Sequence, residues 1–107
     1  MSQAQREWEP EEAPQGALSR EEVQQRHRQV RDWTLRENSL EREFRFDDFD
    51  EAMDFVNDVA ALARDADHHP DIHISYNKVR LELTTHRVHG LSGLDFDLAA
   101  QVDRLLL

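Results

Sequence analysis

The sequence predicts an α+β fold: a four-stranded antiparallel sheet with three helices packed on one face, in the order α-β-β-α-β-β-α. Two observations lead to this prediction. Three segments repeat apolar residues at spacings of three and four, and four shorter segments alternate apolar with polar residues. Strands that alternate in polarity need cover on one side only, so the simplest arrangement gathers all helices on that side.

Length and charge limit the possible functions. A chain of 107 residues forms one domain with a modest core, which oligomerisation would supplement. With 13 Lys+Arg against 23 Asp+Glu, the formal net charge is -10. Such a surface repels phosphates and anionic lipids, so we expect neither a nucleic-acid nor a membrane partner. There is no cysteine, signal segment or apolar span of membrane length, and the expected location is cytoplasmic.

Residues 1–17, here called the leader, lack hydrophobic periodicity and hold two of the three prolines. We interpret them as a flexible acidic leader whose only large apolar residue is Trp8. The domain then spans residues 18–107. Its first helix is predicted to begin at Ser19, which forms a capping box with Glu22. The apolar stripe of this helix includes His27, which we expect to pack rather than to do chemistry.

Two strands should follow. Trp33 and Leu35 alternate with polar neighbours, the residues "ENS" supply a turn, and the second strand places Leu40, Phe44 and Phe46 on one face. Arg42 interrupts that face, and we expect it to mark a point where the face leaves the core.

The longest helix begins after Asp47 or Asp48, either of which can cap it. Its predicted apolar stripe consists of Phe49, Met53, Val56, Val59, Ala60 and Ala63. The last helix repeats the capping-box spacing with Ser92 and Asp95, and a helix cap is a sufficient explanation for Asp95.

Between these helices, "IHISY" and "VRLELTT" alternate strictly and predict a hairpin. With Asn77 and Lys78 as turn residues, Tyr76 faces Val79 and belongs to the apolar face with Ile72 and Ile74. The same register places His73 across from Glu82.

Extending this register outward places His69 opposite His86, on the face away from the core. Directly paired residues have Cβ atoms about 4.5–5.5 Å apart, so two imidazoles could flank one small ligand. Pro70 holds His69 in an extended conformation outside the helix. His68 should then approach the same volume from another side.

Neighbouring imidazoles can hold a proton donor and a proton acceptor together near neutral pH, as elimination of water requires. The alternative is a zinc site of His68, His69, His73 and His86. Strand parity and the proline scatter these side chains, and no thiolate or close carboxylate set completes a tetrahedron, so acid/base chemistry is favoured.

The segment "DHHPDIHISYNKVRLELTTHRVHGLSGLD" resembles the pterin-4a-carbinolamine dehydratases. The resemblance rests on the His-His-Pro triplet, the aromatic-Asn pair at the turn, the Thr-His after the second strand and the Gly-Leu-Ser-x-x-Asp start of the last helix. Weaker matches upstream are Trp33 and "FRFDDF", and the resemblance covers about residues 19–107.

The resemblance implies dehydration of 4a-hydroxytetrahydropterin to quinonoid dihydropterin, which recycles the cofactor of aromatic amino-acid hydroxylases. It implies a catalytic set of His68, His69 and His86, with substrate binding by Asp67, Pro70, Tyr76 and Thr85. No metal and no cofactor besides the pterin substrate are implied, and a homodimer or homotetramer is expected.

Two points stay open. Where the family often has a glutamate four residues before the first histidine, this chain has Arg64, so Asp65 or Asp67 would have to supply a nearby carboxylate. The same scaffold also serves as a partner-binding or assembly factor, because function resides in the site and not in the architecture.

Overall fold

The structure is a computed structural model that describes residues 17–107. Its elements are α1 (Arg20–His27), β1 (Thr34–Leu35), β2 (Leu40–Arg45), α2 (Phe49–Ala66), β3 (Asp71–Ser75), β4 (Lys78–Leu83) and α3 (Gly93–Arg104). Short 3₁₀ helices, η2 (Arg28–Val30) and η3 (His86–Val88), follow α1 and β4. The predicted order α-β-β-α-β-β-α is confirmed. The predicted leader, except for Ala17, lies outside the described residues.

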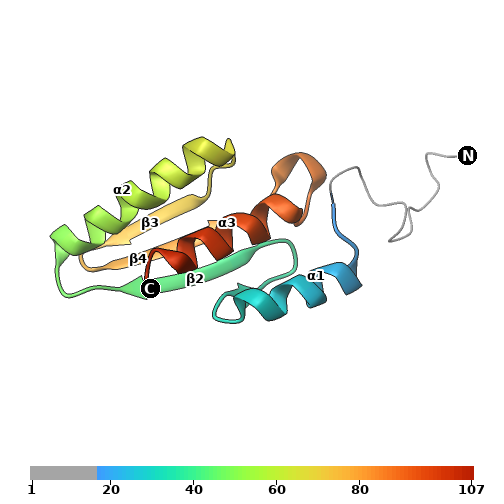
Figure 1. Cartoon of the computed structure of the whole chain (residues 1–107), viewed down its shortest axis with the longest axis horizontal. Coiled ribbons are helices and arrows are strands. Elements are labelled where there is room, and N and C mark those ends of the chain that lie inside the picture. The colour runs from blue at the N-terminus through green and yellow to red at the C-terminus, as the bar shows by residue number, and fades with distance from the viewer. Residues whose placement is uncertain (1–16) are drawn as a thin grey trace, which may run out of the picture.

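The four strands form one antiparallel sheet in the order β1-β2-β4-β3. Helices α2 and α3 lie side by side over one face of this sheet (Figure 1). β3 is an edge strand, because only β4 pairs with it. Within residues 17–107, no helix is both long and apolar enough to span a bilayer.

The helix starts agree with the sequence predictions. Ser19 and Glu22 form a reciprocal capping box at α1, and Ser92 and Asp95 form another at α3. Asp48 caps α2, accepting a hydrogen bond of 2.9 Å from the Glu51 amide. These side chains satisfy backbone N–H groups that have no partner within the first helical turn.

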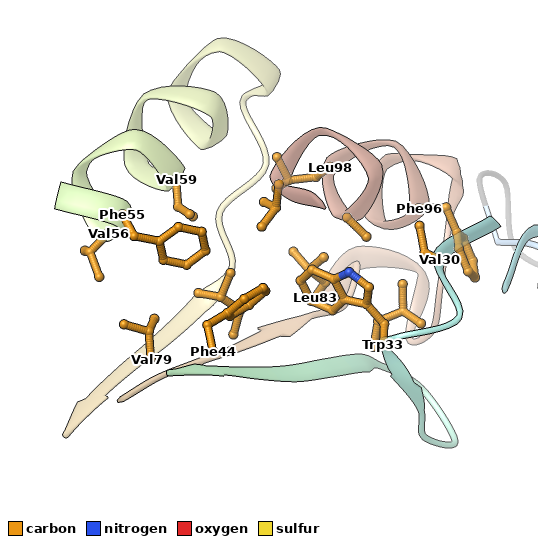
Figure 2. Packing of buried hydrophobic residues seen from close by; sticks show 14 of the residues in the cluster. Val30, Trp33, Phe44, Phe55, Val56, Val59, Val79, Leu83, Phe96 and Leu98 are labelled. Carbon is orange, nitrogen blue, oxygen red and sulfur yellow. The ribbon is translucent and has the colours of Figure 1, made fainter. Parts of the chain in front are cut away.

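The core lies between the sheet and the two long helices (Figure 2). The stripe predicted for α2 is partly wrong, because Phe49 is 46% exposed while Phe55, absent from the prediction, is buried. The Phe55 ring packs 4.7 Å from Phe44 and 5.0 Å from Phe46, measured between centroids. These aromatic contacts turn α2 toward β2, so the buried face runs through Ala52, Phe55, Val56, Val59 and Ala63.

The expectation that the strand face leaves the core at Arg42 is wrong. It pairs with buried Leu81 across the sheet, so its side chain points toward the helices. Its guanidinium lies 2.7 Å from Asp103 of α3 and 4.6 Å from the centroid of the Phe44 ring. Asp103 also accepts a hydrogen bond of 2.8 Å from the indole of Trp33. The break in the pattern is therefore an ion pair that joins β2 to α3.

The hairpin has a different turn from the predicted one. Ser75 pairs with Lys78 and Ile74 with Val79, so Tyr76 and Asn77 are the turn residues. The predicted partners are wrong by two residues, and His73 faces Arg80 rather than Glu82. A shift of two residues preserves side-chain parity, which is why the predicted faces of the strands still hold.

The prediction that Tyr76 belongs to the core is also wrong, since this residue is 66% exposed. Its φ of 54° is the positive value that two-residue hairpin turns require at their first position. The cause is a tertiary clamp: Asn77 donates through its amide to the Phe46 carbonyl and accepts from the Phe46 N–H, both at 2.8 Å. Two hydrogen bonds, each contributing about 1 kcal/mol, offset the cost of a left-handed tyrosine.

Candidate active site

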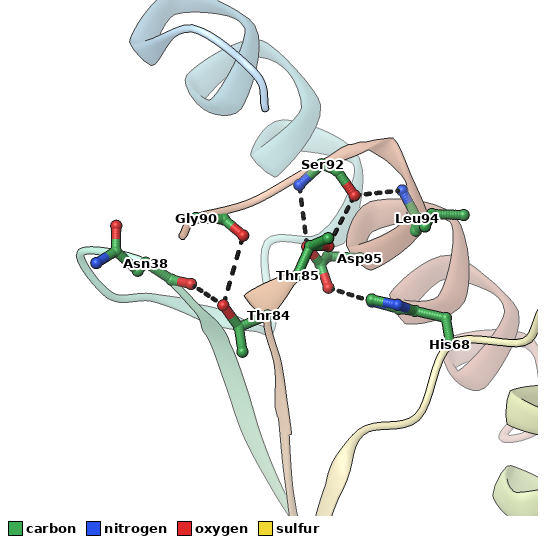
Figure 3. A network of polar contacts seen from close by, with 8 residues as sticks. All are labelled: Asn38, His68, Thr84, Thr85, Gly90, Ser92, Leu94 and Asp95. Carbon is green, nitrogen blue, oxygen red and sulfur yellow. Dashed lines mark hydrogen bonds and ion pairs between the residues drawn. The ribbon is translucent and has the colours of Figure 1, made fainter. Parts of the chain in front are cut away.

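A buried polar network joins the end of α2, the end of β4 and the start of α3 (Figure 3). At its centre Asp95, fully buried, holds His68 through Nε2 at 2.6 Å and Thr85 through its hydroxyl at 2.7 Å. The Ser92 amide donates to the same carboxylate at 3.0 Å, and the Ser92 hydroxyl lies 2.8 Å from that of Thr85. Charged and polar groups at this depth persist only when they are paired.

The directions of these hydrogen bonds follow from the chemistry of the groups. An ionised carboxylate only accepts, so the single hydroxyl proton of Thr85 is directed at Asp95. The hydroxyl of Ser92 must then donate to Thr85 while it accepts from the Leu94 amide. No buried side-chain nitrogen or oxygen lacks a partner in residues 17–107, so the network is complete.

The same argument assigns the protonation of His68. Because Asp95 is the acceptor, Nε2 of His68 carries a proton, and Nδ1 is the nitrogen left for other chemistry. Asp95 therefore sets both the tautomer and the orientation of this imidazole. His68 is only 8% exposed, so its ring is held from inside the protein.

Local sequence places His68 at this point. Asp67 ends α2 in a left-handed conformation with a φ of 53°, and its amide and that of His68 donate to carbonyls of the last turn. Aspartate tolerates this conformation better than most residues. Pro70 then directs the chain into β3. The sequence left open whether His68 belongs to the end of the helix or to the connection, and the structure places it in the connection between α2 and β3.

His69 and His86 do not pair across the hairpin, which corrects the central geometric expectation. β3 begins at Asp71 and β4 ends at Leu83, so both histidines lie beyond the ladder, and His86 opens η3. The two histidines are related indirectly, through Asp95. Asp95 binds both His68 and Thr85, and His69 and His86 are the residues that directly follow these two. Both are exposed, so two surface imidazoles each lie one residue from an anchor on the same carboxylate.

The residues predicted to bind substrate lie in different environments. Asp67 and Tyr76 are exposed and Pro70 is half-buried, whereas Thr85 is 2% exposed with its hydroxyl committed to the network. Arg64 is exposed in the last turn of α2, where a cation suits the helix dipole. A hollow of about 330 Å³ on the uncovered sheet face is lined by His86 together with Glu82 and Thr84. Substrate contacts stay predictions.

Other predicted alternatives can be placed as well. Trp33 is 1% exposed and belongs to the core. His27 bonds the Trp33 carbonyl at 2.6 Å, so the expectation that His27 packs in the structure is confirmed. Across the part of the chain that the structure describes, no three histidine or acidic side chains lie close enough together to hold a metal ion.

Sequence reasoning missed the second role of Asp95. A capping box needs one carboxylate oxygen, and here Oδ2 accepts from the Ser92 amide. The other oxygen is left free for an imidazole from a segment 27 residues away in sequence. The signal that could have found it is the pair of apolar residues Leu91 and Phe96 on either side of the cap, because they indicate a buried helix start, where a carboxylate with a spare oxygen needs a further donor.

The fold and this network define an α+β domain in which one buried carboxylate, Asp95, holds His68 and Thr85, the residues that directly precede the exposed His69 and His86. The family described as pterin 4 alpha carbinolamine dehydratase matches residues 16–105. A relative from Picosynechococcus with the provisional name pterin-4-alpha-carbinolamine dehydratase is 49% identical, covering 82% of this chain and 96% of its own. One from Chloroflexus aurantiacus, with the same provisional name, is 48% identical over 83% and 96%.

Among solved structures, a transcriptional coactivator/pterin dehydratase from Brucella melitensis superposes with a TM-score of 0.79 at 30% identity, covering 83% of this chain and 97% of the other. A pterin dehydratase-like RuBisCO assembly factor of the alpha-carboxysome shares the fold, with a TM-score of 0.57 at 23% identity over 68% and 84%. The chain belongs to the pterin 4 alpha carbinolamine dehydratase family.

Proposed function

We propose that this protein catalyses the loss of water from 4a-hydroxytetrahydropterin by histidine acid/base chemistry. One imidazole takes the proton from N5 and another protonates the hydroxyl on C4a. The C4a–O bond breaks as the N5–C4a double bond forms, which yields quinonoid dihydropterin and water. In a cell this reaction would regenerate the pterin cofactor of aromatic amino-acid hydroxylases.

Membership of the family, together with the Asp95 network, is the observation that carries this proposal. His69 and His86 are exposed and would make the two proton transfers. The buried His68, held by Asp95, would orient the substrate. An imidazole can act as acid or base near neutral pH without a cofactor. In this scheme either surface histidine can be the acid, and the other is then the base.

The direct test is a stopped-flow measurement of 4a-hydroxytetrahydropterin loss with the full-length protein. We expect the protein to accelerate this loss in proportion to its concentration. The spontaneous reaction in the same buffer, with heat-denatured protein added, is the control. Loss at the spontaneous rate would contradict the proposed activity.

A second candidate function is partner binding on the same scaffold. It is favoured by the name of the Brucella relative, which includes a coactivator role. The stopped-flow measurement separates the two, because a binding module needs no effect on pterin loss.

Tyr76 provides a further prediction about the proposed activity. Its positive φ is unfavourable for a bulky side chain, and such strain often persists where a residue serves function. Tyr76→Asn should therefore raise the free energy of unfolding by about 0.5–1 kcal/mol, because asparagine tolerates this conformation. Within one chain the whole length of β3 separates Tyr76 from His69, so its exposed ring would stack on the pterin of a second chain in the proposed assembly, and the same change should then raise KM.

Urea unfolding and initial rates measure the two effects of this substitution. Tyr76→Phe is the matched control, because it keeps the ring and should leave both quantities at the parent values. An unchanged KM in Tyr76→Asn would remove Tyr76 from the proposed substrate site.

The proposed homodimer or homotetramer is supported by β3, an edge strand whose Ile74 is 43% exposed. Light scattering after size exclusion should give a mass of two or four chains, and Ile74→Lys should lower it. A parent protein that stays monomeric at micromolar concentration would contradict the assembly. The cytoplasmic location stays a prediction.

A further inference from the structure

A groove of about 550 Å³ lies between α1, the β1–β2 turn and the segment before α3. We call it the α1 groove. Its apolar lining consists of Leu18, Val23, Leu35, Val88 and Leu91. Its polar rim includes Arg20, Arg36 and His89 with one acidic residue, Glu37. The proposed catalytic histidines do not line it, so the groove has no part in the activity proposed above.

The described chain begins at the wall of this groove. Ala17 forms a β-bridge with Ser92, and the Leu18 amide donates to the Leu91 carbonyl at 2.9 Å. Figure 1 shows the start of the described chain beside the loop that leads into α3. Ala17 and Leu18 are themselves part of the lining. Residues 1–16 therefore continue directly from the edge of the groove.

The composition of residues 1–16 complements the groove in two ways. Their largest apolar side chain is Trp8, and they carry Glu7, Glu9, Glu11 and Glu12 against a single basic residue, Arg6. The whole chain has a net charge of -10, which repels an acidic segment from most of the surface. Arg20 and Arg36 supply the opposite charge at the rim of the groove, where Arg36 is also paired with Glu41 at 3.0 Å. An indole buries a large apolar area and suits an apolar floor with a polar rim.

The chain between Trp8 and Ala17 is long enough for Trp8 to reach the α1 groove. Nine residue steps separate Trp8 from Ala17, and an extended chain covers up to ~30 Å over that length. Attachment to the same chain gives the segment an effective concentration on the order of millimolar at the groove. A weak intrinsic affinity is enough for occupancy under these conditions.

We infer that the α1 groove binds residues 1–16 of its own chain, with Trp8 on the apolar floor and the glutamates of this segment beside Arg20 and Arg36. The segment from Val88 to Leu91, which forms one wall, leads directly to Ser92 of the Asp95 network. When residues 1–16 occupy the groove, they lie against Val88 and Leu91, in the segment that follows His86.

Acrylamide quenching of Trp8 fluorescence in the full-length protein tests this inference. The contribution of Trp8 is the difference between the parent and Trp8→Phe, since the other tryptophan, Trp33, is buried in the core. A synthetic peptide of residues 1–16 gives the value for a free leader. We expect quenching of Trp8 in the protein to be several-fold weaker than in the peptide.

Charge reversal distinguishes the groove from other sites. The double variant Arg20→Glu/Arg36→Glu should restore quenching to the value of the peptide. The matched control Arg28→Glu/Arg31→Glu changes two exposed arginines outside the groove and should keep the parent value. Circular dichroism checks that both variants remain folded.

Three results would overturn the inference: parent quenching equal to that of the peptide, equal effects of the two double variants, or protection of Trp8 that is lost on dilution. The last result would mean that a second copy supplies the leader. None of these results depends on pterin turnover, so the inference and the proposed function fail independently.

Discussion

The variants His69→Ala and His86→Ala are each expected to dehydrate 4a-hydroxytetrahydropterin about 10²–10⁴-fold more slowly than the parent. Each removes a group proposed to move a proton in the transition state, which accounts for the size of the effect. Both side chains are exposed, so their loss should leave the unfolding transition unchanged.

The matched control for these variants is His73→Ala. His73 is also exposed, but it lies within β3 opposite Arg80, away from the two residues bound by Asp95. Its replacement should keep the parent rate in the same stopped-flow measurement. Parent-like turnover in His69→Ala and His86→Ala would contradict the assignment of proton transfer to this pair.

Asp95→Asn should lower the free energy of unfolding by about 1–3 kcal/mol, because one buried donor loses its acceptor. The carboxylate accepts from His68, Thr85 and the Ser92 amide. An amide has one oxygen, so its NH₂ group must face at least one of these donors. The Ser92 N–H cannot accept a hydrogen bond, so the NH₂ group should face His68, and the imidazole then has to move its proton to Nδ1 to accept.

The same substitution should reduce the dehydration rate by about 10²-fold or more, as expected when an imidazole is held in the wrong tautomer. Asp95 acts through His68 and is a positioning residue. Imidazole ¹⁵N chemical shifts report the tautomer directly, and they should show the His68 proton on Nε2 in the parent and on Nδ1 in Asp95→Asn.

Asp103→Asn provides the comparison for a purely structural carboxylate. Asp103 lies on the same helix and accepts from Trp33 and Arg42, so its replacement should cost stability but not turnover by the folded protein. If Asp95→Asn lost only as much rate as the fraction of protein unfolded, the positioning role would be wrong.

Much of the fold was predictable because it depends on local chemistry. The capping boxes at Ser19 and Ser92 need only residues three positions apart, and both formed as predicted. Strand faces depend on a period of two, which the sequence displays directly. The burial of Phe55 in place of Phe49 was not predictable, because both sides of α2 carry apolar residues and only the Phe44 and Phe46 rings select between them.

The hairpin register could not be predicted for the same reason, because a contact between distant segments selects it. Asn77 and Lys78 satisfied the alternation, but the two hydrogen bonds between Asn77 and Phe46 select Tyr76 and Asn77 as the turn. Nothing local favours a left-handed tyrosine, whereas a contact between distant segments can stabilise it. The expected pairing of His69 with His86 depended on the wrong register and failed with it.

The sequence by itself determined the order of elements and the faces of the strands, because both follow from spacing within one segment. It proposed His68, His69 and His86 as candidates for chemistry through the resemblance of their segment to a known family, since the spacing argument for them depended on the wrong register. Only the tertiary structure decided that Asp95 binds His68 and Thr85 together. That carboxylate serves α3 with one oxygen and the end of α2 with the other, and such a link exists only once three separate segments have packed around it.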